Sequence, residues 1–179
     1  VLYENPEAMP RAFTVANARV MSSDAVLDAV NDDSFQPATV VLLEEDPPTS
    51  STDQVSDPPG EIRLERDDPE VFAAVVEMRR PGWFVLMDQL LPGWSATVDG
   101  EPAKIYRANA VGRAVHLAAG RHVVAMSYRA PGFAAGATIS SAAWIAWLGA
   151  MAAVLVRRFR RGRVPGEESV PDAARTTPG

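Results

Sequence analysis

The sequence predicts a mainly β protein: an antiparallel, jelly-roll-like β-sandwich of about seven to nine strands, with a short N-terminal helix and a C-terminal transmembrane helix. Two observations support this prediction. Short runs of apolar and β-branched residues recur about every 8 to 12 residues, with Gly, Pro or Asp between them. Residues 134–156 then form a run of 23 without a single charge. Neither an internal repeat nor a βαβ alternation is evident in the sequence.

The first part of the chain combines short strands with one helix. The apolar segments 12–16 and 19–21 predict a short strand or a hairpin. Residues 24–30 follow two serines that favour a helix start, and their apolar side chains recur at helical spacing, so they predict a short helix. The β-branched and apolar run 39–43 predicts a buried strand.

A linker separates this part from the rest of the domain. Residues 45–60 predict a flexible loop, because two Pro-Pro pairs stand among Ser, Thr and Asp. Apolar and charged residues alternate over 61–66, which indicates a half-buried strand. Residues 71–78 predict the next strand, and the Asp-Asp-Pro at 67–69 predicts the turn between the two.

The strongest turn signal in the chain is Asp99-Gly100. Both central residues of a type I′ turn need positive φ, which Asp and Gly tolerate, so this dipeptide predicts a tight hairpin. We expect residues 104–107 to pair back on the strand before the turn. The strands predicted in this half of the domain are 83–88, 94–98, 104–107, 113–117 and 122–128.

Charge and cysteine content exclude several classes of function. The net charge is −6, and residues 1–133 hold 20 acidic against 11 basic residues. General nucleic-acid binding needs a basic face, so this acidic body argues against a nucleic-acid partner. The chain has no cysteine, which excludes disulfides, cysteine-ligated zinc and thiol catalysis.

The uncharged segment 134–156 predicts the transmembrane helix. A helix of that length spans about 34 Å, which exceeds the roughly 30 Å hydrocarbon core of a bilayer. A buried helix of a soluble protein is the alternative, but such helices rarely run so far without a charge. The segment is rich in Ala and Gly, and small residues favour close packing on other helices.

Arginines set the expected orientation of this helix. Five of them lie within residues 157–163, and the positive-inside rule places them in the cytoplasm. Residues 1–133 are then extracytoplasmic, and residues 157–179 form a basic, disordered cytoplasmic tail. The first 11 residues show no signal peptide and the chain begins with Val, so we expect a fragment whose missing upstream part carries the domain across the membrane.

Two pairs of residues are candidates for chemistry. Asp88 and Asp99 could serve as a carboxylate pair for acid–base catalysis, although Asp99 is better explained by the turn and Asp88 by the end of a strand. His116 and His122 flank the Gly120 turn and could approach each other on paired strands. Two histidines without a third ligand make a poor zinc site, so no metal and no cofactor are predicted.

Aromatic and polar residues provide candidate glycan contacts. Flat aromatic faces suit sugar rings, but aromatic side chains also fill sandwich cores, and core packing is the favoured interpretation. Nearby polar side chains could face a phosphate or an anionic lipid, with solvation or an ion pair with Asp88 as the favoured alternative. The candidates are Trp83, Trp94, Tyr106, Arg107, Asn109 and Arg113, with Tyr128 as a further aromatic residue.

Several segments resemble the C-terminal region of the YfhO family of bacterial membrane proteins. The opening LYENPEAMPRAF at 2–13 is similar to the family's segment after its multi-helix part, and with the strands over 61–78 the resemblance covers most of the chain. The most specific pieces are GWFVLMDQLLPGWSATVDG (82–100), AKIYRANAVGRAVHLAAGRHVVAMSYRAPGF (103–133) and GATIS (136–140).

The resemblance implies a parent protein in the bacterial cell membrane that is similar to GT-C glycosyltransferases. Such enzymes use a polyprenyl-phosphate sugar donor and modify cell-envelope glycopolymers such as lipoteichoic acid. Their catalytic acidic residue lies in an early loop that this chain lacks, so no catalytic residue is assigned. Expected partners are membrane lipid, the upstream transmembrane bundle, and envelope glycan or polyprenyl-linked sugar. The alternative is a membrane-tethered carbohydrate-binding or protein-interaction module without an enzymatic parent.

Overall fold

The computed structural model describes residues 8–47 and 57–161, with side chains up to residue 160. Most of the predicted loop 45–60 and the tail after residue 161 lie outside the described residues, as does the beginning of the opening segment. The chain divides into two compact units, Val1–Pro131 and Gly132–Gly179.

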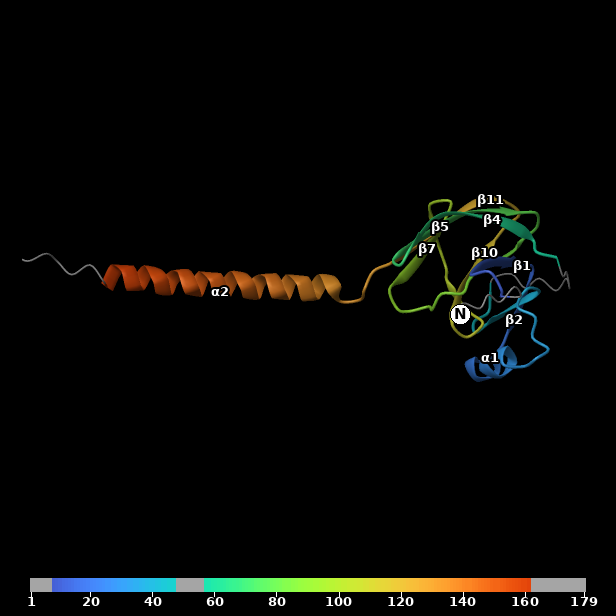
Figure 1. Ribbon diagram of the computed structural model, residues 1–179, viewed down its shortest axis with the longest axis horizontal. Helices are drawn as coiled ribbons and strands as arrows, with labels where there is room; N and C mark the ends of the chain where they lie inside the picture. The colour runs from blue at the N-terminus through green and yellow to red at the C-terminus, as the bar shows by residue number, and fades with distance from the viewer. Residues whose placement is uncertain (1–7, 48–56, 162–179) are drawn as a thin grey trace, which may run out of the picture. The chain divides into compact units, whose positions relative to one another are not determined.

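The described part of the first unit is a sandwich of two β-sheets with one short helix, which confirms the predicted fold class (Figure 1). Its eleven strands exceed the predicted seven to nine. Its elements are β1 (Ala12–Val15), β2 (Asn17–Val20), α1 (Ser23–Val30), β3 (Val40–Leu43), β4 (Gly60–Asp68), β5 (Val71–Met78), β6 (Gly82–Leu86), β7 (Trp94–Val98), β8 (Glu101–Ala103), β9 (Tyr106–Ala108), β10 (Gly112–Leu117) and β11 (Gly120–Tyr128). Sheet A runs in the order β1-β6-β10-β9-β3-β2, and sheet B in the order β4-β5-β11-β7-β8.

The main core lies between the two sheets. Inward-facing side chains alternate along the strands, as in Phe84 and Leu86 of β6 and Val124 and Met126 of β11, all of which are buried. The intervening residues of β6, Trp83 and Val85, belong to a second apolar cluster on the other face of sheet A. All five residues of β6 are therefore buried, and this strand is the centre of the unit.

The N-terminal segment pairs differently from the prediction. Segments 12–16 and 19–21 do contain strand residues, but the hairpin alternative is wrong, because β1 pairs antiparallel with β6 whereas β2 pairs parallel with β3. Parallel neighbours need a crossover connection, and α1 lies in it. The chain thus contains one β-α-β unit that the sequence did not suggest, since its strands have only four residues each.

The Asp99-Gly100 hairpin is confirmed, but its return strand was misplaced. Asp99 and Gly100 both have positive φ, and Val98 pairs with Glu101 directly after the turn. A two-residue turn places pairing immediately after Gly100, so β8 covers 101–103 and not 104–107. The chain then leaves sheet B, and β9 joins sheet A between β10 and β3.

The second unit is dominated by α2 (Phe133–Arg161). Among the described residues, α2 alone is long and apolar enough to cross a membrane, and an 18-residue window within Phe133–Arg160 has a mean hydropathy of 1.9. Its large apolar side chains are exposed, from 43% for Met151 to 78% for Phe159.

Two glycines with positive φ offer a matched test of the packing. A Cβ at Gly93 (φ 109°) would overlap the carbonyl oxygen of Arg129, whereas a Cβ at Gly100 (φ 87°) would meet no atom within 4 Å. We predict that Gly100→Ala lowers the free energy of unfolding by about 1 kcal/mol through backbone strain alone. Gly93→Ala should lower it by roughly 3 kcal/mol, because the overlap adds to the strain.

Urea unfolding of the full chain in detergent micelles, followed by near-ultraviolet circular dichroism, measures both losses. Equal losses for the two variants would contradict the close approach of Arg129 to Gly93.

Candidate functional site

Four charged side chains meet at one end of the strands of sheet A. Leu86, the last residue of β6, pairs with Ala12 on one side and Arg113 on the other. Arg11 precedes β1 and Asp88 follows β6, so the register of the sheet places both next to Arg113. Residues separated by as many as 102 positions in the sequence are thereby brought to one point, which we call the Asp88 cluster (Arg11, Asp67, Asp88 and Arg113).

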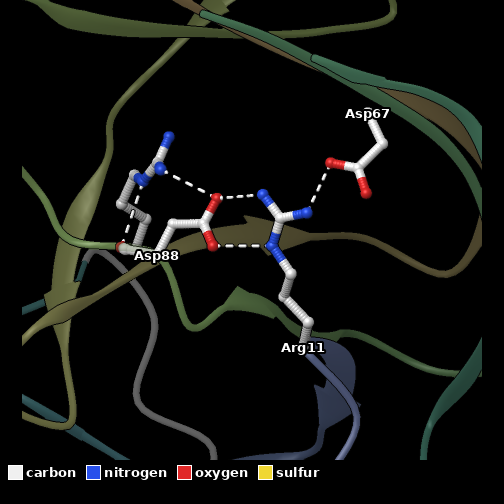
Figure 2. Close-up of polar contacts among 4 residues, drawn as sticks. Arg11, Asp67 and Asp88 are labelled. Carbon is white, nitrogen blue, oxygen red and sulfur yellow. Dashed lines mark hydrogen bonds and ion pairs between the residues drawn. The ribbon is translucent and has the colours of Figure 1, made fainter. Parts of the chain in front are cut away.

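Asp88 is held by two arginines. Arg11 binds it as a fork: Nε donates to Oδ1 and Nη2 donates to Oδ2, both at 2.7 Å (Figure 2). Arg113 donates from Nη2 to Oδ2 at 3.1 Å and from Nε to the Asp88 carbonyl at 3.2 Å. The remaining Nη1 of Arg11 donates to Asp67 of β4, so the cluster joins sheet A to sheet B.

Arg113 is the buried member of the cluster. Its side chain is only 2% exposed, compared with 25% for Asp88 and 49% for Arg11. The guanidinium carbon lies 3.7 Å from the ring centroid of Trp94, so the cation stacks on the indole face. Its Nη1 is buried without a hydrogen-bond partner.

The cluster shifts the ionisation of its members. The hydrogen bonds from Arg11, followed by the charges of both arginines, hold the pKa of Asp88 below its ordinary value. Asp88 in turn raises the pKa of Arg11, whereas burial lowers that of Arg113. An anion so stabilised has little tendency to take up a proton near neutral pH, which makes Asp88 a poor general acid or base.

Asp99, the other candidate carboxylate, also has hydrogen-bond partners close to it. Oδ1 accepts from the Val123 backbone N–H and Oδ2 lies 2.7 Å from Nδ1 of His122, and these bonds lower the pKa of Asp99. The two carboxylates belong to separate interactions: Asp99 to the hairpin turn and Asp88 to its two arginines.

The two histidines lie on different sheets, so the expected pairing of their strands is wrong. His116 is on β10 of sheet A and contacts Trp83 edge-on at 5.1 Å, and burial lowers its pKa. His122 is on β11 of sheet B beside Asp99. In the described part of the chain, no three His, Cys, Asp or Glu side chains gather as a metal site would require.

Four of the six candidate glycan contacts are buried. Trp83 and Tyr106 pack against each other at 5.2 Å in the core of sheet A. Asn109 accepts from the Leu42 N–H through its side chain and donates to the Leu42 carbonyl through its backbone. With Arg113 in the Asp88 cluster, these side chains already have partners within the fold.

Trp94 and Arg107 are the two candidates with accessible side chains. Both line a groove of about 560 Å³ whose other walls are mostly apolar, including Leu91, Pro102 and Ile105. Trp94 also packs on Tyr128 with ring centroids 5.4 Å apart, and Arg107 lies 3.7 Å from Glu44. Glycan contact by the six residues stays a prediction, and this groove is where it can be tested.

Sequence reasoning anticipated the Asp88–Arg113 pair but missed Arg11 and Asp67 as its extension. Arg11 stands 77 residues from Asp88, beside an irregular proline-rich segment, so no local pattern indicates the contact. The available signal was the placement of the first strand next to β6, which the hairpin prediction obscured.

The buried cation makes a strong prediction about Asp88. Asp88→Asn leaves Arg113 without its counter-ion and should lower the free energy of unfolding by about 2–4 kcal/mol. Asp67→Asn removes the more exposed of the two carboxylates that bind Arg11, and should lower the free energy of unfolding by less than about 1 kcal/mol. Urea unfolding of the full chain in detergent at pH 7 measures both, and equal costs would contradict a special role for Asp88.

The lowered pKa of Asp88 also predicts a pH dependence. The contribution of Asp88 to the free energy of unfolding is fully present above its unfolded-state pKa of about 3.9. It is lost as the pH falls through the lower pKa that Asp88 has in the folded state. The difference in unfolding free energy between wild type and Asp88→Asn should therefore shrink as the pH is lowered from 5 toward 2. A difference that stays constant over this range would show that the charge of Asp88 is not what stabilises the fold.

Comparison with known proteins gives one family match. Residues 91–140 match the family described as bacterial membrane protein YfhO. They run from the loop before β7 through β11 and into the first turns of α2. Curated proteins and solved structures give no match to the chain. The resemblance inferred from the sequence is thus confirmed, and over residues 91–140 this chain is similar to the YfhO family of bacterial membrane proteins.

Proposed function

We propose that the chain is the C-terminal accessory part of an integral membrane protein of the glycosyltransferase type. In this proposal the parent transfers sugar from a polyprenyl-phosphate donor to a glycopolymer of the cell envelope. The sandwich lies on the extracytoplasmic side, α2 is the last transmembrane helix, and the arginines at its C-terminal end lie in the cytoplasm. The chain itself carries no catalytic group and braces the upstream helices.

The observation that carries the proposal is the apolar character of α2. Eleven of its large hydrophobic side chains are more than 40% exposed, an apolar surface that water-soluble proteins rarely leave uncovered. The same helix contains Gly136, Gly149 and many alanines, and no atom lies within 4 Å of a Cβ placed on either glycine. Lipid and neighbouring helices are the two environments that suit such a surface.

The family match supports treating the sandwich and the helix as one module. Residues 91–140 cross from one unit to the other without interruption, so the resemblance includes the connection itself. The match to a bacterial membrane protein family agrees with a membrane role, and the transferase chemistry is inferred from the resemblance of that family to GT-C enzymes.

The state of the acidic residues supports a non-catalytic role. Asp88 is neutralised by Arg11 and Arg113, and Asp99 is engaged by the Val123 N–H and His122. Neither carboxylate has the raised pKa that a general acid requires.

The groove lined by Trp94 and Arg107 favours a second candidate function. An aromatic face beside a cation can hold a sugar bearing a phosphate or carboxylate, so the chain would then be a membrane-tethered glycan-binding module. Arg107→Gln, which leaves the Asp88 cluster untouched, should abolish retention on envelope glycopolymer if this candidate is right. Unchanged retention would exclude the groove as the binding site.

Cysteine labelling tests the orientation cleanly, because the natural chain has no cysteine. Glu101→Cys lies in the exposed hairpin end of the sandwich, and Thr176→Cys lies after the arginines. In intact cells a membrane-impermeant maleimide should label position 101 but not position 176. Position 176 should be labelled only after the cells are permeabilised. The reverse pattern would contradict the proposed orientation, and equal labelling of both sites in intact cells would contradict a single span.

A transfer assay and the upstream coding sequence test the enzymatic part. Membranes containing only this chain should not move radiolabelled sugar from a polyprenyl-phosphate donor to envelope polymer, whereas membranes with the complete parent should. Transfer by the chain alone would overturn the accessory role. Many hydrophobic spans encoded before Val1 would support the enzyme, and a lone signal peptide would support the tethered module.

A further inference from the structure

Two loops at one end of the sandwich form an apolar tip. The loop segment 89–92 lies in the connection between β6 and β7, and the loop 109–111 connects β9 to β10. The Leu90 N–H donates to the Val111 carbonyl at 2.9 Å, so the loops are joined by their backbones. Leu91 and Val111 are nevertheless 44% and 47% exposed. Large apolar side chains exposed on two adjoining loops indicate a contact surface and not a core.

The tip is tied to the segment that leads into α2. The Arg129 N–H donates to the carbonyl of Gly93 at 2.9 Å, and Gly93 is two residues from Leu91. Four residues further on, Phe133 begins the helix. Four residues of fully extended chain reach at most about 14 Å, so the covalent connection keeps Arg129 within that distance of Phe133.

Aromatic side chains occupy the same end of sheet B. Trp94 pairs with Tyr128 in the register of β7 and β11, and their rings pack at 5.4 Å. Both are partly exposed, and the groove lined by Leu90, Leu91 and Trp94 lies beside them. Trp and Tyr are the residues that membrane proteins place at the level of the lipid headgroups.

We propose that the apolar tip of Leu91 and Val111 inserts into the outer lipid interface next to α2, to the depth of the headgroups. This inference rests on the proposed transmembrane span of α2. It assigns to the sandwich a lipid contact of its own, which would restrain the domain against the membrane in addition to the single connection through Arg129–Gly132.

The charges near the tip agree with an apolar mode of insertion. Asp88 lies one residue before the first loop, and its charge is balanced by Arg11 and Arg113. Arg129 is exposed beside Gly93. Glu70 is an acidic residue at the same end, since its carbonyl accepts from the Tyr128 N–H. Arg107, which lines the adjoining groove, is paired with Glu44. Because these basic side chains have acidic counterparts, the contact should form on a neutral lipid.

Depth-dependent fluorescence quenching tests the proposal in the full chain. Single cysteines at Leu91, Val111, Val123 or Ile145 are labelled with an environment-sensitive dye, and the protein is placed in phosphatidylcholine vesicles with or without lipids spin-labelled near the headgroup or in the acyl chain. Val123 is the matched control: it is 47% exposed, like Val111, but lies five residues before Tyr128, about 17 Å along the strand. Ile145 reports on α2 itself.

Headgroup-labelled lipid should reduce the fluorescence at positions 91 and 111 about twofold, with little change at 123, while acyl-chain label quenches position 145. If headgroup-labelled lipid does not quench positions 91 and 111 while acyl-chain label still quenches position 145, this inference is overturned but the transmembrane span of α2 is supported. Absence of quenching at 145 would instead overturn the span. A blue-shifted emission at 91 without quenching would mean that protein covers the tip, and would also overturn the proposal.

Discussion

The buried guanidinium of Arg113 is the constraint on which the end of the sandwich depends. A cation removed from water needs a counter-charge and hydrogen-bond acceptors, and Asp88 supplies both through its carboxylate and its carbonyl. Arg11 binds the same carboxylate and links the beginning of β1 to the end of β6. Trp94 covers the remaining face of the cation, so sheet B is held against sheet A at the same point.

This arrangement gives several of the candidate residues a role in the packing of the fold. The strand β6 is buried along its entire length because sheet A has apolar clusters on both faces, and Trp83 and Tyr106 fill the second of these. Thr14 reinforces the contact between the sheets by donating to the Gly60 carbonyl and accepting from the Gly60 N–H. A sandwich built in this way positions its loops rigidly, and rigid loops suit a domain that braces or orients a neighbouring structure.

Function is therefore to be sought at the periphery of the sandwich and not in its core. The accessible features are the groove beside Trp94, the apolar tip that adjoins it, and the exposed apolar surface of α2. All three involve residues within or next to the family-matched segment 91–140. Arg129–Gly132 join the sandwich to α2, and in the proposed function the two units connect the membrane to the outside.

The sequence by itself determined the fold class, most strand positions, the Asp99-Gly100 hairpin and the apolar helix, because alternation, turn chemistry and charge-free length are local properties. Only the tertiary structure decided which strands are neighbours: β1 beside β6, β2 parallel to β3, and β9 in sheet A. Those pairings depend on contacts between distant residues, such as Arg11 and Asp88. The same long-range register decides which of the candidate aromatic and basic residues are buried, so it also decides where a functional surface can lie.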